Sequence, residues 1–579
     1  MINKIFYNLS VTLFGILTLT FVISSVLLNL HIPINICNIL IPFIIGIYYM
    51  FKNSGNKKEF AIQLIVLLLI IFVSLGISLY FWDDTWDGRS YHTAMIILFK
   101  NGWLPLYDNI SEITQKLSLY PYNTQFADPY VKFFEIVGGN IYNLTGYIES
   151  PKISNLLFLC SLFMYSFYVI ENILNKKFIS ILLSVCICLN SVCISQIFSN
   201  YVDLQSYVAF TLFILTVLKI EKSHIQTGSD IFIIIMSSLM LVTVKLTGVI
   251  YCPVIYLSWI FYRIIQRKEV KSIIITSVIS LVLILITCIN PFYTNIKKFN
   301  HPFYPMMGQN GYDVEHANYP RKFKNKTPLQ RFLISTFAES MNSIEGDRYC
   351  DINEDYVIKI PFSRIPYTYL NKFDNPDMRI GGFGYYWSGI LCLTVLLFFF
   401  LRFDSKEDKR LFLTLLILIA ISAALNKYNW WTRFVPQLWL IPVISLIFIF
   451  VSKNIKLPKF TYFIAYMCIF FILFNSLLII KEQFLIKYNF SNGNRQLFNQ
   501  VKTDSVPNGI NIMQDMGYNY NLAEETIKPH LQEYKIKFSE VDFDYDKMIN
   551  EGYYRLQVAP VGEYYFFYKP VSDEGINDD

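Results

Sequence analysis

Repeated long apolar runs constrain the fold of this 579-residue chain more than any other feature of its sequence. A run of about 18 or more apolar residues can cross the hydrocarbon core of a bilayer as a helix. Hydrophobic residues make up 54% of the chain and its mean hydropathy is +0.40, which is too apolar for a soluble protein of this length. The sequence therefore predicts an all-α polytopic membrane protein.

Lys and Arg gather in alternate loops between the apolar runs, as the positive-inside rule requires of cytoplasmic loops. These loops account for the formal charge of +6, so no nucleic-acid binding is predicted. The pattern predicts thirteen spans in the plasma (inner) membrane, with the N-terminus in the cytoplasm and the C-terminus outside. The runs cover residues 10–30, 36–51, 61–81, 154–174, 178–198, 204–220, 231–244, 249–262, 272–289, 385–401, 411–425, 434–451 and 460–480.

Three sizeable polar stretches remain, and all of them fall on the predicted outer face. They are residues 82–150, 290–383 and 482–579. We expect a transmembrane domain over residues 1–481 and a small extracytoplasmic α/β domain over 482–579. A helix at 521–528 and strands at 553–558 and 563–569 are predicted in the latter from their residue patterns.

An acidic segment follows the third apolar run directly. Asp83, Asp84 and Asp87 lie within five positions of one another, and Arg89 and His92 come next. A single acid at the membrane edge is more often an interfacial cap, but three acids together favour a site. Carboxylates at the mouth of a helical bundle are candidates for a general base or for metal ligands.

An amphipathic helix is predicted just after these acids, because Tyr91, Ala94, Met95 and Leu98 repeat with helical spacing. We expect it to lie along the membrane interface. The residues before it suggest two local roles. Gly88 would allow a sharp turn, and the residue at position 90, a serine, would cap the helix.

Three further candidates lie at the predicted outer ends of other spans. Asp203 offers a second carboxylate, while Lys245 and Arg433 are cations placed outside, against the positive-inside bias. Either cation could simply extend its charge to the interface. An anionic ligand on the outer face is the alternative explanation, and Gly248 would then allow that ligand to approach closely.

Together these motifs resemble the GT-C superfamily of membrane glycosyltransferases, including bacterial relatives of protein O-mannosyltransferases and lipid A aminoarabinose transferases. Two departures are clear: two extra spans precede the helix that leads into the motif-bearing loop, and Gly88 follows Asp87 where those relatives carry Glu. The matching segments are Trp86-Asp87-Gly88-Arg89-Ser90-Tyr91-His92, Tyr201-x-Asp203, Lys245-x-Thr247-Gly248, Asn290-Pro291 through His301-Pro302-Phe303-Tyr304-Pro305, and Arg433-Phe434-x-Pro436.

The resemblance implies a GT-C-like bundle and transfer of a sugar from a polyprenyl-phosphate-linked donor to an envelope glycan, lipid or protein acceptor on the outer face. Lys245 and Arg433 would bind the donor phosphate, and Asp87 would be the general base. The remaining roles implied are stabilisation of the transition state or binding of a divalent cation, Mg²⁺ or Mn²⁺, by Asp84 and Asp203, and substrate binding by Arg89, Tyr91 and His92.

Two alternatives from other classes stay open. One is a transporter or flippase for a lipid-linked saccharide, and the other is a non-catalytic protein that binds such saccharides. A transporter is expected to carry acids or broken helices near the bilayer midplane, and the apolar runs contain hardly any acids. The enzyme is therefore preferred.

Overall fold

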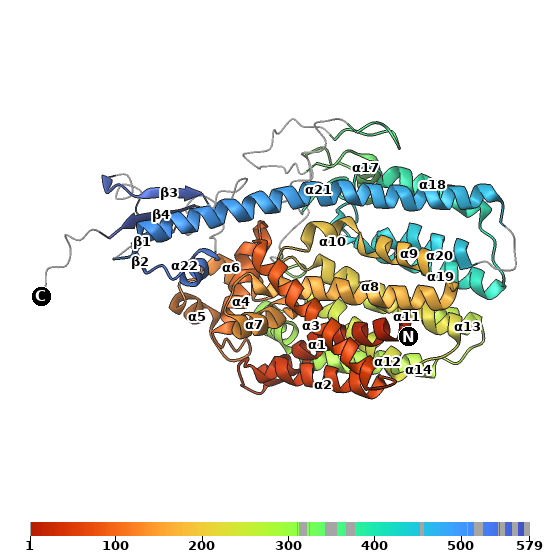
Figure 1. The fold of residues 1–579 in the computed structure, drawn as a ribbon, viewed down its shortest axis with the longest axis horizontal. Coiled ribbons are helices and arrows are strands. Elements are labelled where there is room, and N and C mark those ends of the chain that lie inside the picture. Colours follow the sequence, from red (N-terminus) through yellow and green to blue (C-terminus); the bar gives the residue numbers. More distant parts are fainter. Residues whose placement is uncertain are drawn as a thin grey trace, which may run out of the picture.

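The computed structural model describes residues 2–309, 311, 321–323, 325–341, 356–365, 377–451, 457–505, 508–514, 525–541, 544, 550–557 and 565–571. These residues form a bundle of long helices and one small sheet (Figure 1). The sheet lies beyond one end of the bundle. The N-terminus lies toward the opposite end.

Each of the thirteen predicted spans is helical over most of its length, so the chain is an all-α, multi-pass membrane protein with a small C-terminal α/β unit. By length and composition, six of the described helices can cross a bilayer, or seven if a pair bent by 72° counts as one span. The helices are α1 (Ile2–Asn29), α2 (Cys37–Asn53), α3 (Lys57–Tyr80), α8 (Ile153–Leu174), α9 (Lys177–Cys188), α10 (Ser191–Gln196), α11 (Asp203–Ser223), α12 (Gly228–Val244), α13 (Gly248–Ile265), α14 (Lys271–Thr287), α18 (Trp387–Phe400), α19 (Lys406–Ala424), α20 (Leu440–Val451) and α21 (Lys459–Asp504).

The expected span at 178–198 is divided between α9 and α10. Asn190 stands at the break, where its side chain accepts a hydrogen bond from the Val192 amide at 3.0 Å and so caps α10. The amide nitrogen of the same side chain donates to the Pro436 carbonyl, also at 3.0 Å. An Asn with these two partners offers the backbone an alternative to continuing the helix.

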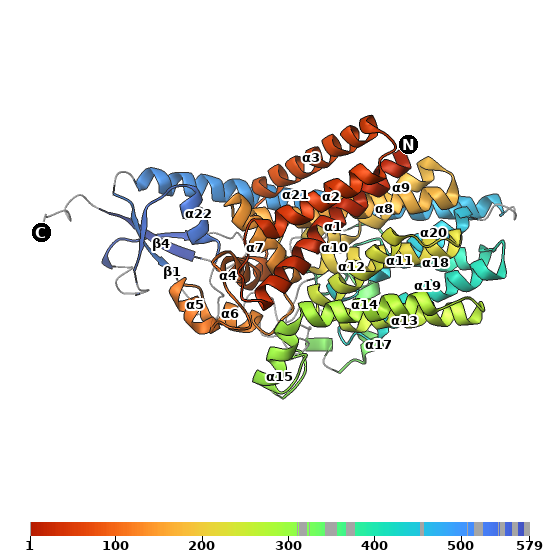
Figure 2. The same cartoon turned by 90° about the horizontal axis from the view of Figure 1, so that it is seen from below.

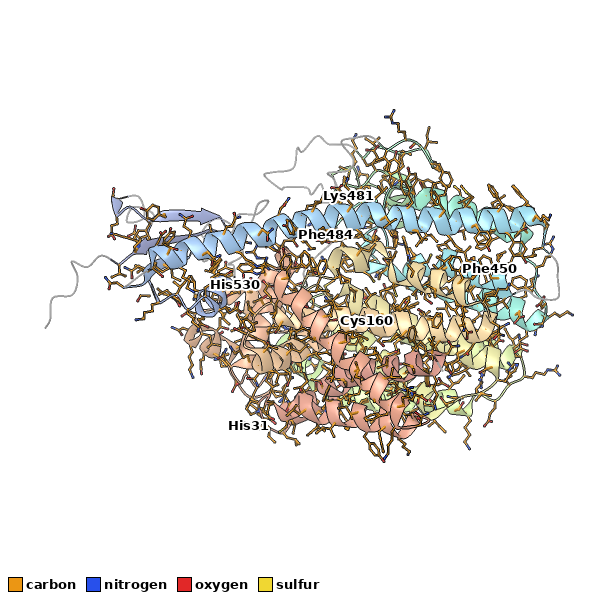
Figure 3. All side chains as sticks on the ribbon, in the orientation of Figure 1. His31, Cys160, Phe450, Lys481, Phe484 and His530 are labelled. Carbon is orange, nitrogen blue, oxygen red and sulfur yellow. The ribbon has the colours of Figure 1, made fainter. Side chains whose placement is uncertain are left out.

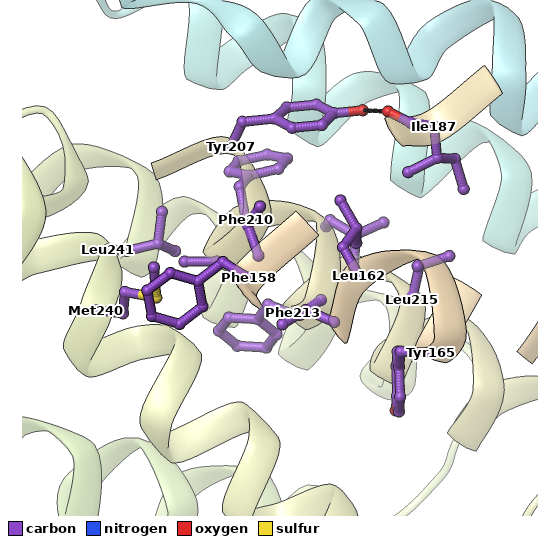
Figure 4. Packing of buried hydrophobic residues seen from close by; sticks show 14 of the residues in the cluster. Phe158, Leu162, Tyr165, Ile187, Tyr207, Phe210, Phe213, Leu215, Met240 and Leu241 are labelled. Atoms are coloured by element: carbon purple, nitrogen blue, oxygen red, sulfur yellow. Dashed lines mark hydrogen bonds between the residues drawn. The ribbon is translucent and has the colours of Figure 1, made fainter. Parts of the chain in front are cut away.

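The helix α11 forms the centre of the bundle and packs against α8 and α12. Phe213 of α11 lies among Phe158 and Leu162 of α8 and Met240 of α12 (Figure 4). Tyr207 donates a hydrogen bond from its hydroxyl to the Ile187 carbonyl at 2.8 Å in the same region. Such pairing is required where no water is available to a buried polar group.

By contrast, α3 lies on the outside of the bundle (Figure 2). Of the most apolar part of this helix, only 17% of the residues are buried inside the protein. Exposed residues on this helix include Leu69 and Phe72. An exposed apolar surface of this kind fits contact with lipid tails.

The first polar stretch folds into a compact group of short helices between α3 and α8. The predicted interfacial helix corresponds to α4 (Thr93–Lys100), but its first seven residues are buried and it packs against α7. The prediction of an interfacial position was wrong, because the other helices of the stretch cover it. These elements are η1 (Gly88–His92), a π-helix, with α5 (Ile110–Lys116), α6 (Pro121–Ala127), α7 (Phe133–Thr145) and η2 (Ser150–Lys152).

The second polar stretch begins at the bend that follows α14. Here Asn290 leaves the helical conformation, and Pro291 lacks the amide hydrogen that a continuous helix needs. Lys132 links this bend to the first polar stretch, because its Nζ donates to the Asn290 side chain at 2.8 Å. The described elements of the second stretch are η3 (Ile289–Tyr293), α15 (Thr294–Phe299), η4 (Arg321–Phe323) and α17 (Pro328–Phe337).

The C-terminal sheet is carried by α21, a continuous helix of 46 residues that extends past the end of the bundle (Figure 1). The expected domain boundary after residue 481 falls inside this helix. The four strands are β1 (Ile510–Gln514), β2 (Phe538–Glu540), β3 (Tyr554–Gln557) and β4 (Tyr565–Pro570), in the spatial order β2-β1-β4-β3. The pairing of β1 with β2 is parallel and the other two pairings are antiparallel.

The helix α22 (Ile527–Glu533) completes this unit. It starts near the end of the helix predicted at 521–528, of which residues 521–524 lie outside the described part. Both predicted strands are present as β3 and β4, and residue 558 of the first and residues 563–564 of the second lie outside the described part. The small apolar core contains Phe498, Ile512 and Leu531, and Trp82 from the first polar stretch is inserted into it.

Candidate active site

Arg433 lies among three carboxylates that come from distant parts of the sequence. Its Nη2 contacts Asp87 Oδ2 at 3.0 Å, its Nε contacts Asp203 Oδ2 at 3.0 Å, and its Nη1 contacts Asp377 Oδ1 at 2.9 Å. The face of the guanidinium lies over the Tyr201 ring, 4.6 Å from its centroid. Every nitrogen of the guanidinium therefore has an acidic partner.

Lys245 joins the same cluster through Asp203, whose other carboxylate oxygen accepts a hydrogen bond from the lysine Nζ. The Nζ also lies 3.7 Å from the centroid of the Phe434 ring. Asp203 is fully buried and is held by Gln196 as well, whose amide nitrogen donates to it at 2.8 Å. The predicted residues Asp87, Asp203, Lys245 and Arg433 are thus brought together.

The positions of these side chains follow from the ends of helices. Asp203 is the first residue of α11, where a negative charge interacts favourably with the helix dipole. Lys245 ends α12 in an extended conformation. Arg433 lies in η6 (Thr432–Phe434), a single 3₁₀ turn before η7 (Pro436–Trp439), and the Phe434 carbonyl accepts hydrogen bonds from Tyr251 and Asn426.

Two charged members of the site, Asp377 and Arg379, were not predicted. They lie just before α18, and Arg379 Nη2 is 3.9 Å from Asp377 Oδ2. Burial raises the pKa of the Asp377 carboxyl, and Arg433 and Arg379 oppose this shift. One signal in the sequence could have identified them: both lie shortly before the apolar run at 385–401, at its predicted outer end. The acidic segment at 83–87 lies at the outer end of its own run in the same way.

Other predicted residues have partners outside this cluster. Asp84 pairs with Lys487 of α21, at 2.5 Å. Arg89 is buried with its guanidinium 4.9 Å from the centre of the Phe490 ring. His92 Nδ1 lies 2.5 Å from Glu135 Oε1. Asp84 and Arg89 therefore connect the acidic segment to α21.

Tyr91 lies next to the Arg433 cluster, near Asp87. Burial is the main cause of its raised pKa, and the nearby Asp87 adds to it. Its ring centroid is 4.3 Å from that of His92. His92 Nε2 is buried and has no hydrogen-bond partner among the described residues.

Two glycines and a serine differ from the roles expected of them. A Cβ on Gly248 would lie 1.8 Å from the Leu241 carbonyl oxygen, so this glycine accommodates a backbone contact and not a ligand. A Cβ on Gly88 would lie 2.1 Å from Asp83 Oδ2. The serine at position 90 does not cap a helix, because its hydroxyl donates back to the Trp86 carbonyl at 2.7 Å.

The charges of the site balance, since three cations (Arg433, Lys245 and Arg379) face three carboxylates. Among the carboxylates, the side chain of Asp87 is the most exposed at 21%, compared with 11% for Asp377 and 0% for Asp203. Asp87 is thus the member that can most easily leave its partner and meet a ligand.

The donor set does not fit a divalent cation. Arg433 lies between the three carboxylates, in the place where a metal ion shared by them would lie. In the part of the chain that the structure describes, no group of three or more His, Cys, Asp or Glu side chains is arranged around a common metal position. The arrangement fits a guanidinium.

No protein-family model and no curated protein matches the sequence. A solved structure with a similar chain is the crystal structure of ArnT from Cupriavidus metallidurans bound to undecaprenyl phosphate. The match has 9% sequence identity and a TM-score of 0.42, and covers 89% of this chain and 98% of that one. At this level it carries no argument about the reaction, so the function is argued from the side chains of this chain.

Proposed function

We propose that this protein is a glycosyltransferase that moves a sugar from a polyprenyl-phosphate-linked donor to an envelope glycan, lipid or protein acceptor on the outer face of the membrane. The observation that carries the proposal is the contact between Asp87 and Arg433 at 3.0 Å. A partly exposed carboxylate is a suitable general base, and a buried guanidinium is a suitable phosphate ligand. Sugar transfer from a lipid phosphate needs a general base and a phosphate ligand next to each other.

The donor phosphate supplies the reason for so many cations. A phosphodiester carries one negative charge, and the leaving polyprenyl phosphate gains a second as its bond to the sugar breaks. Preorganised cations stabilise charge that develops in the transition state. Arg433 and Lys245 take this role, and Asp203 holds both of them through its two oxygens.

A bound phosphate adds negative charge to a balanced cluster, so it has to replace one of the carboxylates. Asp87 is the most exposed of the three and contacts a single nitrogen of Arg433. We infer that the phosphate takes Nη2 and releases Asp87. Donor binding would then free the base that the next step needs.

In that step the acceptor oxygen attacks the anomeric carbon, and the bond from this carbon to the phosphate oxygen breaks. The polyprenyl phosphate leaves with the electron pair, and Asp87 takes the proton of the acceptor hydroxyl. The balance is complete without an oxidant or a further reactant. The transition state has oxocarbenium character, which the released carboxylate of Asp87 also stabilises.

The π-helix η1 supports acceptor binding by Tyr91 and His92. Its wide turn, in which the Thr93 amide donates to the Gly88 carbonyl five residues before, places residues 87 and 92 one turn apart on the same side. Glu135 holds His92 by Nδ1, and Nε2, which is buried in the free protein, would meet the acceptor when the donor phosphate has displaced Asp87. π-turns occur frequently at functional sites.

The test is Asp87→Asn, which keeps the shape of the side chain and removes its basicity. Purified protein in lipid nanodiscs is given a panel of polyprenyl-phosphate monosaccharides and candidate acceptors, and release of polyprenyl phosphate is measured. We expect release to fall by about a hundredfold to ten-thousandfold, as is typical when a general base is lost. Binding of undecaprenyl phosphate should persist.

Glu112→Gln, an exposed change in the same polar stretch, is the matched control and should leave release unchanged. Release of polyprenyl phosphate by Asp87→Asn at the rate of the unmodified protein would show that Asp87 is not the general base. Binding without release by the unmodified protein, over the whole panel, would favour the transport or binding alternatives.

A further inference from the structure

The first polar stretch and the C-terminal unit meet at a buried carboxylate, Glu149. Its Oε1 lies 3.2 Å from His530 Nε2, and its Oε2 accepts a hydrogen bond from the Asp83 amide at 3.1 Å. Lys152 pairs with the same Oε2. Glu149 therefore connects α22, which carries His530, to the start of the acidic segment (Figure 3 labels His530).

The other nitrogen of His530 also has an acidic partner. Nδ1 lies 3.1 Å from Glu533 Oε2, and the imidazole stacks on the Trp82 ring with centroids 3.7 Å apart and an angle of 3° between the planes. His530 is 1% exposed. Two carboxylates on two ring nitrogens require a donor at each nitrogen, which only the protonated imidazolium provides.

Asp83 continues the connection into the candidate active site. Its Oδ1 accepts from the amide and hydroxyl of Thr85, at 2.9 and 2.6 Å, and its Oδ2 accepts from the Asn200 amide at 2.8 Å. Gly88 lies directly against the Asp83 carboxylate. Asp83 thus joins the loop that contains Asp87 to the loop that leads into Asp203.

We propose that His530 is a positioning residue of the C-terminal unit, which fixes the two loops that carry Asp87 and Asp203 through the hydrogen-bonded series His530–Glu149–Asp83–Asn200. Every member of the series is buried, so each contact is formed away from water, where hydrogen bonds to charged groups are strong. The C-terminal unit is therefore part of the active-site framework. The consequence for sugar transfer rests on the function proposed above.

The series depends on pH through His530. The groups that face it are Glu149 and Lys152 from the first polar stretch and Glu533 on its own helix, with the uncharged rings of Trp82 and Phe498. Burial alone would lower the pKa of His530, but the hydrogen bonds to its two carboxylates raise it above the ordinary 6.5. The stabilisation is thus fully present below pH 6.5 and is lost as the pH rises through the raised value.

Other contacts keep the unit attached when His530 is changed. The Glu525 carboxylate accepts from the Tyr120 amide at 2.9 Å and from the Asn123 side chain at 3.1 Å. Lys528 donates to the Ser118 carbonyl at 2.8 Å. A substitution at His530 should therefore loosen the two loops without releasing the domain.

The experiment is hydrogen exchange by mass spectrometry on the full-length protein in nanodiscs, from pH 6 to pH 9. Peptides containing the amides of Asp83 and Asn200 are followed in the unmodified protein, in His530→Gln and in His530→Phe. Gln can donate a hydrogen bond to Glu149 as His530 Nε2 does, but it does not titrate. Phe keeps an aromatic ring to stack on Trp82 and has no hydrogen-bond donor. Lys528→Met is the matched control, because it removes a docking contact outside the series.

We expect His530→Phe to exchange at Asp83 and Asn200 about tenfold faster than the unmodified protein at pH 6, and Lys528→Met to match the unmodified protein. This factor corresponds to losing a hydrogen bond to a charged group. Compared at each pH, the unmodified protein should exchange like His530→Gln at pH 6 and faster than His530→Gln above the titration of His530. With an active donor, the kcat of His530→Phe should fall by a similar factor.

Equal exchange in His530→Phe and the unmodified protein at pH 6 would overturn the proposal, as would equal exchange in His530→Gln and the unmodified protein at every pH. If His530→Phe does not fold, the comparison with His530→Gln across pH decides alone. Hydrogen exchange needs no substrate, so it tests the positioning role separately from sugar transfer. If the expected exchange pattern is found but the protein transfers no sugar, the proposed glycosyltransferase activity is refuted and the positioning role of His530 is retained.

Discussion

At the scale of single residues, the site is organised by the competition of three carboxylates for Arg433. Each carboxylate helps to offset the desolvation of a buried guanidinium, which would be costly if it were unpaired. Removing Arg433 would leave the three acids facing one another, and breaking such a buried pair typically costs about 3–5 kcal/mol of stability. Asp377 is a better probe of the electrostatics, because its removal leaves Arg433 with two partners.

We predict that Asp377→Asn binds undecaprenyl phosphate more tightly, by up to about tenfold. The change removes one negative charge beside Arg433 and keeps an oxygen next to Nη1. Tenfold in Kd corresponds to about 1.4 kcal/mol. Binding to protein in nanodiscs is measured by titration at low and high salt, and Glu112→Gln is the control. Weaker binding by Asp377→Asn would mean that this carboxylate itself supports the phosphate site.

At the scale of elements, the segment from Asp83 to His92 is fixed by contacts rather than by its own conformational preferences. The Asp83 carboxylate lies where a side chain on Gly88 would be, and the His92 ring, at the end of the π-helix that follows, is held by Glu135. Position 88 needs a residue without Cβ because there is no space for one. The φ angle of Gly88 is not in the left-handed region, so its conformation does not require glycine. The glycine that follows Asp87 therefore has a packing reason.

Gly88→Ala should displace the Asp83 carboxylate and lower sugar transfer at least tenfold, with a loss of thermal stability. A Cβ at position 88 would lie 2.1 Å from Asp83 Oδ2 and 2.3 Å from Thr85 Oγ1, so one of the contacts that join the two loops has to break. Melting of the purified protein and release of polyprenyl phosphate are the two measurements.

Gly493→Ala in α21 is the matched control, because a Cβ there meets no atom within 4 Å. It should keep activity and add up to about 1 kcal/mol of stability from helix propensity. Normal melting and transfer by Gly88→Ala would show that the acidic segment adapts to the added methyl group.

At the scale of the whole molecule, the C-terminal sheet lies at one end of the bundle and α21 reaches it from the other (Figure 1). The charge alternation predicts that this end is extracytoplasmic, together with residues 82–150 and 290–383. We expect cysteine labelling to support that orientation. The ten native cysteines are first replaced, and single cysteines are then introduced at exposed positions.

A cysteine in place of Glu540, in β2, should react with a membrane-impermeant maleimide added to intact cells. A cysteine in place of Lys409, near the start of α19, should react only after the membrane is opened. Both positions are exposed, so the difference reports the side of the membrane and not burial. The reverse pattern would place the sheet and the acidic segment in the cytoplasm and remove the outer-face reaction.

The sequence by itself determined the helices and most of the charged site. Hydrophobic runs long enough for a bilayer leave little choice of structure, because every backbone polar group in lipid must be paired within a helix. Asp87 could be identified because three acids cluster after an apolar run, Asp203 because it lies at the outer end of another run, and Lys245 and Arg433 because they lie outside against the positive-inside bias. Their residue types therefore stood out without any knowledge of distance.

Only the tertiary structure decided which charges meet. Asp84 and Asp87 lie three residues apart in one acidic segment, yet one pairs with Lys487 and the other with Arg433. Asp377, Glu149 and His530 lie far from the motifs in the chain and reach their partners through the packing of helices. Hydrophobic periodicity specifies which face of each helix is buried, but pairing between charges depends on distances that only the folded bundle sets.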